Sequence, residues 1–288
     1  MKILVTGANG QLGREMRNVL ESEYPGNTLY TDIDTLDLTD LKAIERFVIS
    51  NDITHIVNCA AYTAVDRAEE EKLECSAVNV DAVKNIARVA DSNGVKVIHI
   101  STDYVFDGKS HRPYSESDKV NPISQYGTTK RTGETALLAL APESIIIRTA
   151  WLYSPYGHNF VKAILNRAAD SNPLRVVADQ IGSPTYAADL ARAIYKILRS
   201  QQWVQGIFHY TDSGVASWYD FAKAILDLSG HAEKKVQPIP TTDYPTVATR
   251  PYYSVLDTQR ISATYDVAIP YWRESLAKCL KRIADNEQ

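Results

Sequence analysis

The sequence predicts an α/β fold, namely a Rossmann-like, doubly wound parallel sheet with a smaller C-terminal α/β region. Three observations predict it. Short apolar, β-branched runs alternate with amphipathic segments through the first half of the chain. A glycine-rich turn lies between the first run and the first amphipathic segment. After about residue 150 the alternation becomes looser, and a proline-rich stretch interrupts it.

The strand candidates of the first half are almost continuously apolar, as in strands that are covered on both faces. Between them, apolar side chains such as Leu12, Met16 and Leu20 recur every three to four residues, which indicates amphipathic helices. Repeated strand–helix–strand units predict a parallel sheet with right-handed crossovers. The runs are ILVT (3–6), TLYTD (28–32), HIVNC (55–59), KVIHI (96–100) and SIIIRT (144–149).

Further elements are expected in the second half of the chain. Ser217 precedes a helical pattern and Asp220 follows three residues later, in the arrangement of a capping box. Prolines in the stretch 237–251 exclude a regular helix or a central strand, so we expect an ordered loop over a cleft there. The strand candidates are 175–177 and 206–210, and the helix candidates are 187–199 and 217–229.

The length of 288 residues allows one large α/β domain or a domain with an appendage. We expect residues 1–150 to form a dinucleotide-binding Rossmann domain, with contributions from later segments. Residues 151–288 are expected to form mainly a substrate-binding α/β region.

Composition indicates an ordinary soluble globular protein, with 44% hydrophobic and 23% charged residues. No segment approaches the roughly 18 apolar residues of a membrane span, and the start of the chain reads as strand and turn rather than signal peptide. We therefore expect a cytoplasmic protein without a membrane partner. A net charge of −4 gives no reason to expect nucleic acid. The three cysteines lack a Cys-x-x-Cys spacing, which predicts reduced thiols.

The turn after the first strand, TGANGQLG, contains Gly7, Gly10 and Gly13 in a G-x-x-G-x-x-G pattern. Glycine is needed where a tight turn lets the backbone approach a pyrophosphate, and the following helix N-terminus offers free N–H groups to the phosphates. A structural turn is the alternative. The position of the pattern, at the start of an alternating β/α chain, favours a dinucleotide site.

Asp32 ends the second strand about 20 residues after the third glycine, where a carboxylate accepts hydrogen bonds from the adenosine ribose and repels a 2′-phosphate. This position favours NAD(H). Arg14 follows Gly13 and is either a partner for a 2′-phosphate or a solvated residue, so use of both NADH and NADPH stays open. Asp37 and Leu38 are candidates to line the adenine, although Asp37 is equally a candidate helix cap.

The segment QYGTTKRTGE (125–134) places Tyr126 and Lys130 four residues apart, on one face of a predicted helix. A free phenol has a pKa of about 10, and a neighbouring ammonium is expected to lower it toward the range of efficient acid–base catalysis. The same lysine has donors left for a nicotinamide ribose. The structural alternative is a buried tyrosine beside a solvated lysine.

The fourth strand ends in Ser101, Thr102 and Asp103. Ligands of doubly wound sheets bind outside the carboxyl ends of the strands, so a hydroxyl here would face a bound nicotinamide. Thr102 is therefore expected to hydrogen-bond a substrate carbonyl oxygen and the Tyr126 phenol, while Tyr126 protonates the developing alkoxide.

These residues resemble those of the short-chain dehydrogenase/reductase superfamily, in its extended branch that acts on nucleotide sugars. Their order and spacing are similar to those of the dTDP-4-dehydrorhamnose reductase family over nearly the whole chain. The motifs are VNCAAYTAVDRAE (57–69), STDYVFDG (101–108), YGTTK (126–130), RTAWLY (148–153), DQIGSPT (179–185) and YPTVATRP (244–251).

The resemblance implies reduction of the C4 ketone of dTDP-4-dehydro-β-L-rhamnose by NADPH or NADH, the last step of dTDP-L-rhamnose synthesis. It implies Tyr126 as the catalytic acid, Lys130 as its partner and Thr102 as the residue that tunes it. The substrate contacts that it implies are Thr102, Asp103 and Trp151, and Arg250 is a candidate for the diphosphate or else a solvated loop arginine. The implied cofactor contacts are Gly10, Gln11, Leu12, Asp32, Asp37, Leu38, Ala60, Ala61, Tyr62, Tyr126 and Lys130.

Some members of this family hold magnesium with acidic residues at a dimer contact. Glu15 matches one such position, but Ala188 stands where we look for a second carboxylate. We therefore expect no metal ligands here, although magnesium stays possible, and the protein is expected to be a monomer or a homodimer.

Two other functions stay open. One is a nucleotide-sugar epimerase or dehydratase of the same fold, which keeps its NAD bound. The other is a non-catalytic, dinucleotide-binding regulatory subunit, against which the combination of Thr102, Tyr126 and Lys130 counts.

Overall fold

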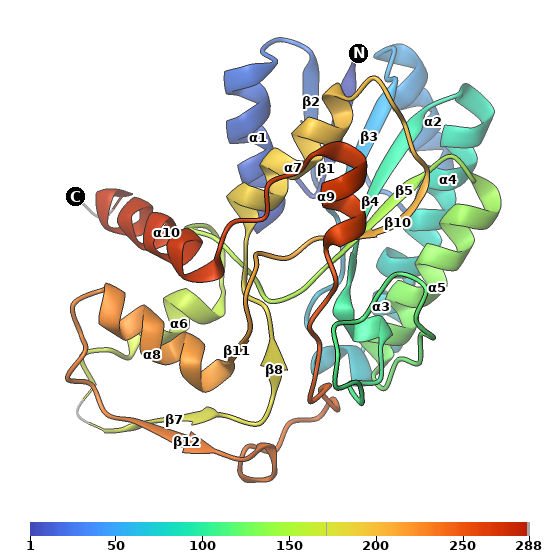
Figure 1. The fold of residues 1–288 in the computed structure, drawn as a ribbon. Coiled ribbons are helices and arrows are strands. Elements are labelled where there is room, and N and C mark those ends of the chain that lie inside the picture. The colour runs from blue at the N-terminus through green and yellow to red at the C-terminus, as the bar shows by residue number, and fades with distance from the viewer. Residues whose placement is uncertain (171, 287–288) are drawn as a thin grey trace.

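The computed structural model describes residues 1–170 and 172–286 and contains the predicted parallel sheet (Figure 1). Six strands lie in the order β2-β1-β3-β4-β5-β10, and every neighbouring pair is parallel. The doubly wound fold and the first five strands are therefore confirmed. The strands are β1 (Ile3–Thr6), β2 (Thr28–Thr31), β3 (His55–Asn58), β4 (Lys96–Thr102), β5 (Ile145–Thr149) and β10 (Gly206–His209).

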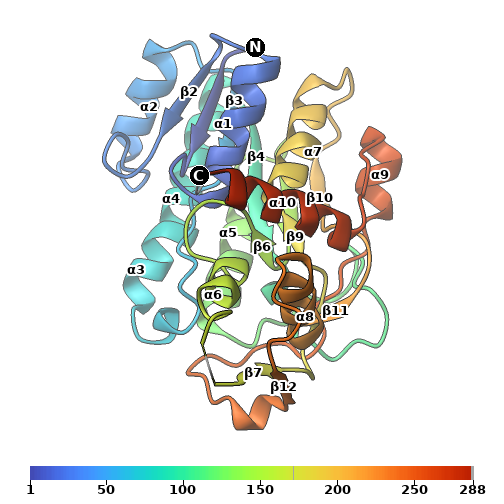
Figure 2. The same cartoon turned by 90° about the vertical axis from the view of Figure 1, so that its left-hand side faces the viewer.

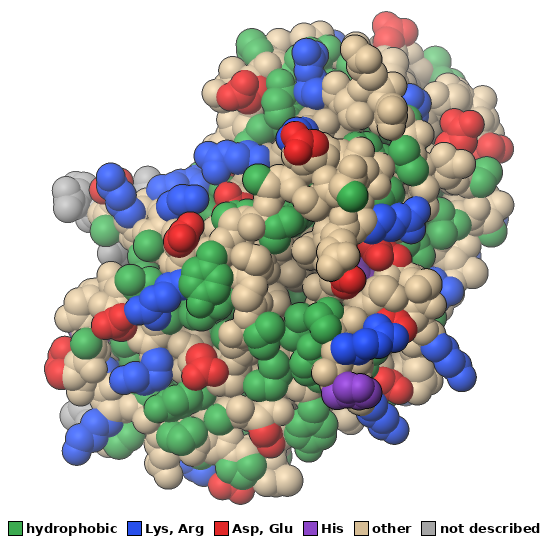
Figure 3. Space-filling model, viewed as in Figure 1, with side chains coloured by type: hydrophobic (Ala, Val, Ile, Leu, Met, Phe, Trp, Pro, Cys, Tyr) green, Lys and Arg blue, Asp and Glu red, His purple; other side chains and the backbone are tan. Residues whose placement is uncertain are grey.

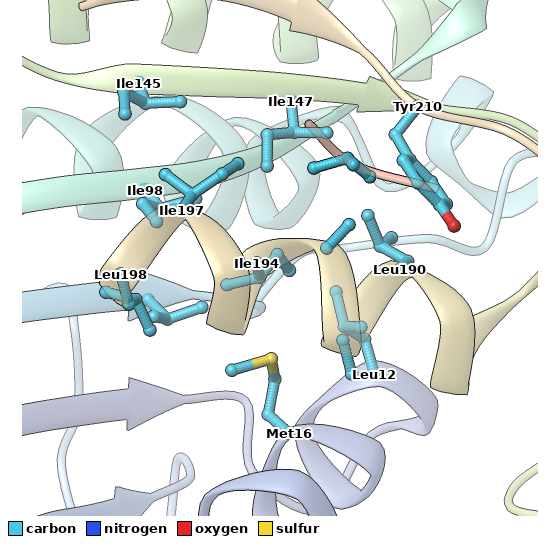
Figure 4. Close-up of a cluster of buried hydrophobic side chains, with 14 of the residues drawn as sticks. Leu12, Met16, Ile98, Ile145, Ile147, Leu190, Ile194, Ile197, Leu198 and Tyr210 are labelled. Atoms are coloured by element: carbon cyan, nitrogen blue, oxygen red, sulfur yellow. The ribbon is translucent and has the colours of Figure 1, made fainter. Parts of the chain in front are cut away.

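Helices cover both faces of the sheet (Figures 1 and 2). On one face, Leu12 and Met16 of the first helix and Ile194 of the seventh pack beneath Ile98 and Ile147 of the sheet (Figure 4). A second apolar cluster fills the other face. The first face carries α1 (Gln11–Glu23), α7 (Ala187–Arg199) and α9 (Gln259–Tyr265), and the second carries α2 (Leu41–Ser50), α4 (Ala82–Asn93) and α5 (Gln125–Leu140).

A second region packs at the carboxyl edge of the sheet and has an apolar core of its own (Figure 1). The capping box of Ser217 and Asp220 is confirmed at the start of α8. The helices are α6 (Phe160–Asn166), α8 (Trp218–Leu228) and α10 (Trp272–Asn286). The paired strands are β7 (Leu174–Val177) with β12 (Val236–Ile239), β8 (Ile181–Gly182) with β11 (Ala216–Ser217), and β6 (Leu152–Tyr153) with β9 (Thr185–Tyr186).

Three elements from beyond residue 150 belong to the sheet layers, namely α7, β10 and α9. They are the later contributions expected for the Rossmann domain, and the division near residue 150 itself stays a prediction. Residues 287 and 288 of the expected second region lie outside the described residues. The proline-rich stretch begins within the two-stranded β7–β12 pair and continues as loop with one short turn of helix, Thr241–Asp243.

Within the described residues, no helix is both long and apolar enough to cross a bilayer. On the face shown in Figure 3, positive and negative side chains are interspersed. The remaining helix, α3 (Lys72–Ser76), joins α4 through a π-helical turn, Ala77–Asp81.

Candidate active site

Two adjoining cavities open at the carboxyl ends of the sheet strands, with volumes of about 590 and 440 Å³. Both are lined by Gly7, Gly10, Cys59 and Ala61, so the glycine-rich turn lies between them. The larger one, which we call the reaction cavity, reaches from this turn to α6 and α8. The smaller one, the adenosine cavity, lies beside the end of β2.

The glycine-rich turn leaves no room for side chains at two positions. Gly7 has φ +63°, and a Cβ there would lie 2.6 Å from Ala60 N. A Cβ at Gly13 would lie 2.2 Å from the carbonyl oxygen of Gly7. Gly10, the N-cap of α1, provides no side-chain cap, so first-turn N–H groups stay available to an anion. The predicted dinucleotide turn therefore has the close packing and the donors that pyrophosphate requires.

Gln11 links this turn to the second region. Its Oε1 accepts hydrogen bonds from Asn159 Nδ2 at 3.0 Å and from Ser154 Oγ at 3.2 Å. Leu12 also lines the reaction cavity. The start of α1 is thereby held against the segment that leads into α6.

Asp32 lines the adenosine cavity, as predicted for a ribose-binding carboxylate. Its Oδ2 accepts from Asn9 N at 2.9 Å, and Arg14 Nε donates to Asn9 O at 3.0 Å. The Asp32 carboxylate and the Arg14 guanidinium thus both bind the backbone of Asn9 in the turn. Asp37 accepts from Thr39, and Asp40 caps α2, so the capping alternative for Asp37 is wrong. The other lining residues predicted from the sequence are Leu38, Ala60, Ala61 and Tyr62.

Thr102, Tyr126 and Lys130 all line the reaction cavity. Ser124 caps the helix that carries Tyr126 and Lys130, by accepting from Gly127 N at 3.1 Å. A Cβ at Gly127 would lie 2.2 Å from Tyr104 O, so glycine lets the first turn of this helix approach the loop after β4. The helix start and the strand end therefore lie against each other, as the sequence predicts.

The protonation of this group differs from the expectation. Burial raises the pKa of Tyr126, and the Thr102 hydroxyl only partly opposes this effect. Lys130 Nζ donates to Ile100 O at 2.7 Å, and burial lowers its own pKa to about 8. The expectation that the pKa of the phenol is lowered is therefore wrong for this structure, because desolvation raises it and outweighs the one opposing effect, the Thr102 hydrogen bond.

Thr102 and Asp103 form a pair at the end of β4. Thr102 Oγ1 donates to Asp103 Oδ1 at 2.9 Å and accepts from Tyr104 N at 3.2 Å. Burial raises the pKa of Asp103 to about 6, against hydrogen bonds from Ser254 and Thr102. The threonine hydroxyl therefore has to exchange its carboxylate acceptor before it donates to another oxygen.

Trp151 forms part of an aromatic wall of the reaction cavity. Its ring stacks on Trp218 with centroids 3.6 Å apart, and a Cβ at Gly182 would lie 2.6 Å from the ring. Its φ of +49° is rare for a bulky residue and strains the backbone. Contacts with Trp218 and Gly182 hold the ring in place despite this strain. Phe160 and Phe221 complete the wall.

Arg250 lies outside the reaction cavity and lines a third cavity of about 310 Å³. Its guanidinium donates to both oxygens of Asp66, at 3.0 and 2.7 Å. Ala248 N also donates to Asp66, at 3.0 Å, so this carboxylate holds the proline-rich loop. Trp218 and Phe160 line both this cavity and the reaction cavity, which places the two side by side.

Comparison with known proteins identifies the family. The family described as "RmlD substrate binding domain" matches residues 1–285. The chain belongs to this family. A dTDP-4-dehydrorhamnose reductase from Aggregatibacter actinomycetemcomitans is 40% identical over 285 residues, which cover 96% of this chain and 97% of that protein. A dTDP-4-keto-6-deoxy-D-glucose reductase from Streptomyces niveus is 36% identical, over 99% of this chain and 98% of its own.

Solved structures agree with this assignment to the RmlD family. A dTDP-4-dehydrorhamnose reductase from Clostridium acetobutylicum superposes with a TM-score of 0.94 and 42% identity, over 99% of this chain and 100% of that one. Its counterpart from Bacillus anthracis, solved in complex with NADP, gives 0.91 and 36%, over 98% and 100%. The extended short-chain dehydrogenase/reductase fold is thus confirmed.

A magnesium site does not fit the described residues of this RmlD family member. Glu15, which matches a ligand position of other family members, is buried, and its Oε1 accepts from Arg282 at 2.8 Å. Ala188 offers no side-chain oxygen, and the described residues contain no group of three His, Cys, Asp or Glu side chains that could hold a metal ion. A guanidinium thus neutralises the carboxylate where a divalent cation would need it free.

Sequence reasoning missed a buried polar chain behind Lys130. Thr6, Asn58 and His99 are hydrogen-bonded in series, and Lys130 Nζ lies 3.4 Å from His99 Nε2. The available signal was a polar residue inside each of two apolar runs, HIVNC and KVIHI. Such residues need buried partners, and here they find each other.

Proposed function

We propose that the protein reduces the C4 ketone of dTDP-4-dehydro-β-L-rhamnose to dTDP-L-rhamnose with NADPH or NADH. One observation carries this proposal: Thr102, Tyr126 and Lys130 line one cavity together with the dinucleotide turn. The full-length similarity to dTDP-4-dehydrorhamnose reductases supports it.

The dinucleotide fits along the turn and the adenosine cavity. We assign the pyrophosphate to the first turn of α1 at Gly10, Gln11 and Leu12, and the ribose to Asp32. A bound NAD(P)H supplies the hydride. Arg14, fixed beside the turn, adds a cation near the ribose, so we propose that the protein uses both NADPH and NADH.

Tyr126 is proposed to give its phenolic proton to the developing C4 alkoxide. Its raised pKa serves this role, because the phenol stays protonated at neutral pH until a strong base develops beside it. Thr102 orients the carbonyl oxygen, and Lys130 binds the nicotinamide ribose. The charge of Lys130 stabilises the phenolate that forms.

The substrate sugar is proposed to lie between Asp103 and Trp151, and the nucleotide end in the third cavity. Arg167, Arg175 and Arg250 line that cavity and suit a diphosphate. Asp66 competes for Arg250, so the diphosphate has to replace or share this partner. Because both proposed ligands are metabolites of the cytoplasm, we also place the reaction there.

The test is an assay of NADPH and NADH oxidation with this 4-keto sugar and with other dTDP-4-keto sugars. We expect Tyr126→Phe to lose two to four orders of magnitude in kcat while its dinucleotide affinity stays nearly unchanged. Tyr271→Phe, at an exposed tyrosine, is the matched control. Comparable turnover in Tyr126→Phe refutes the assignment of the acid.

A second candidate is the reduction of another dTDP-4-keto-6-deoxy sugar, which the Streptomyces niveus relative supports. The ratio of kcat/KM values between the two substrates in the same assay decides between them. Tightly retained NAD absorbance without net oxidation would instead indicate an epimerase or dehydratase. Absence of turnover on all these sugars would instead support a non-catalytic, dinucleotide-binding regulatory subunit.

A further inference from the structure

Lys130 is buried against His99, a side chain that the reaction proposed above does not use. Its Nζ lies 3.4 Å from His99 Nε2 and donates to Ile100 O at 2.7 Å. His99 is 0% exposed and Lys130 is 1% exposed. Within the described part of the chain, no carboxylate forms a salt bridge with this lysine, so the neutral His99 is its main polar side-chain neighbour.

Two donors fix the orientation of the Asn58 amide. Ala60 N and Thr6 Oγ1 lie 3.1 and 2.8 Å from the same amide atom. A backbone N–H can only donate, so this atom is the oxygen, and the amide nitrogen faces His99. That nitrogen lies 3.0 Å from His99 Nδ1. It too can only donate, so Nδ1 carries a lone pair and the proton of the neutral ring resides on Nε2.

The Nε2–H group of His99 therefore points at Lys130. A neutral amine accepts this hydrogen bond and still donates to Ile100 O, whereas an ammonium has only donors to offer. Burial, with the charge of Lys130, lowers the pKa of His99 well below its ordinary value, so the ring stays neutral. The contact thus favours the neutral amine over the ammonium.

Three other groups near Lys130 favour its charged form. Cys59 after β3, Cys75 on α3 and Glu134 on α5 each act to raise the pKa of the lysine. Glu134 is hydrogen-bonded to Arg148, at 2.8 and 2.7 Å, and burial raises the pKa of Cys59 to about 12. Burial still dominates, and it lowers the pKa of Lys130 to about 8.

We propose that His99 is a positioning residue that, oriented by Asn58, presents an N–H to Lys130 and sets the pH above which the lysine loses its charge. The inference rests on the proposed function, in which that charge assists Tyr126. It follows that His99 and Asn58 determine the alkaline limit of the reaction without touching substrate or cofactor.

The first measurement needs no functional variant. Two-bond ¹H–¹⁵N correlations of the full-length protein, with and without NADPH, show which ring nitrogen of His99 carries the proton; His99→Gln identifies the signal. We expect Nε2 to be protonated and Nδ1 to be unprotonated throughout the neutral range. A ring protonated at Nδ1, or at both nitrogens, overturns the proposal.

The second measurement follows Lys130 by ¹³C NMR of its ε-carbon, together with the pH profile of kcat/KM. In Asn58→Asp the new carboxylate can only accept a hydrogen bond, so it favours the ring tautomer of His99 with the proton on Nδ1. Nε2 then presents a lone pair to Lys130. In His99→Gln an amide oxygen can face the ammonium. We expect both changes to raise the lysine midpoint and the alkaline limb by about one pH unit or more. His55→Gln, at the opposite end of β3, is expected to leave both unchanged.

Unfolding curves establish which variants are folded. An unchanged lysine midpoint in a folded variant overturns the proposal, and if neither variant folds, the tautomer of the unaltered protein decides alone. Failure of the proposed function gives a different result, since absent turnover leaves both NMR measurements intact.

Discussion

Two cations, Lys130 on α5 and Arg148 on β5, are buried, and their surroundings differ. Lys130 and Arg148 are each 1% exposed. Arg148 donates to both oxygens of Glu134, which also accepts from Ser101 Oγ at 2.6 Å and from Arg131 at 3.0 Å. Lys130 has a backbone carbonyl oxygen and the His99 ring instead.

The difference separates a structural charge from a reactive one. Burial acts to raise the pKa of Glu134, but Arg148 outweighs this effect and holds it below the ordinary value. The Glu134 carboxylate and the Arg148 guanidinium therefore both stay charged, and the pair links α5 to β5. Lys130 has no ion-pair partner within the described residues, and burial lowers its pKa to about 8. Unpaired buried charges are costly and persist where chemistry uses them.

The largest expected effect comes from removing the unpaired cation. Lys130→Met should lower kcat/KM by about two to four orders of magnitude, because the charge that stabilises the phenolate is lost. The free energy of unfolding should stay the same or rise, because the methionine needs no buried partner. Steady-state kinetics and urea unfolding measure the two effects. A variant that loses stability and activity in proportion would show that Lys130 is structural.

Removing the partner of the compensated cation should act on stability. Glu134→Gln keeps the shape of the side chain but leaves the guanidinium of Arg148 buried without a countercharge. We expect the free energy of unfolding to fall by about 3–5 kcal/mol. Glu45→Gln, at an exposed glutamate of α2, should change it by less than about 0.5 kcal/mol. A small loss in Glu134→Gln would contradict the assignment of a structural role.

The sequence predicts the sheet well because its strands are apolar on both faces. All seven predicted strands are present, including 175–177 within β7 and 206–210 at β10. Two-residue strands such as Ile181–Gly182 were not predicted, because so short a run shows no periodicity. These strands depend on tertiary contacts.

Only those parts of the candidate site that depend on the spacing of residues along the chain are predicted from the sequence. The spacing of Tyr126 and Lys130 correctly places both in one cavity. The direction of the Tyr126 pKa was wrong, since depth of burial cannot be read from a spacing of four residues. The link from Asn58 to His99 depends on the register of β3 and β4, which pairs these two residues across the sheet.

The two charges also predict pH dependences of stability in two separate pH ranges, and in both the free energy of unfolding rises with pH. The folded pKa of Glu134 lies below 4.5, so the stability that it contributes is present above that value and is lost as the pH falls through the folded pKa. Lys130 titrates at about 8 when folded and at 10.5 in its ordinary state. Between these values the unfolded chain binds more protons, so the free energy of unfolding should rise with pH from about 8 to about 10.5. Urea unfolding across this range should show the rise, and Lys130→Met should abolish it.

The smallest effect is expected at the ion pair of Arg250 and Asp66, which shares the two-bond geometry of Arg148 and Glu134 but is more exposed to solvent. Arg250 and Asp66 are joined by two hydrogen bonds, and their side chains are 23% and 41% exposed. Asp66→Asn can keep the acceptor for Ala248 N but removes the charge and one of the two acceptors of Arg250, and because the pair is partly exposed the expected loss of stability is below about 1 kcal/mol. This loss should shrink further at high salt, whereas that of Glu134→Gln should persist, because screening reaches only the exposed pair. Equal losses in the two variants would mean that pairing geometry, and not burial, decides what such a charge contributes.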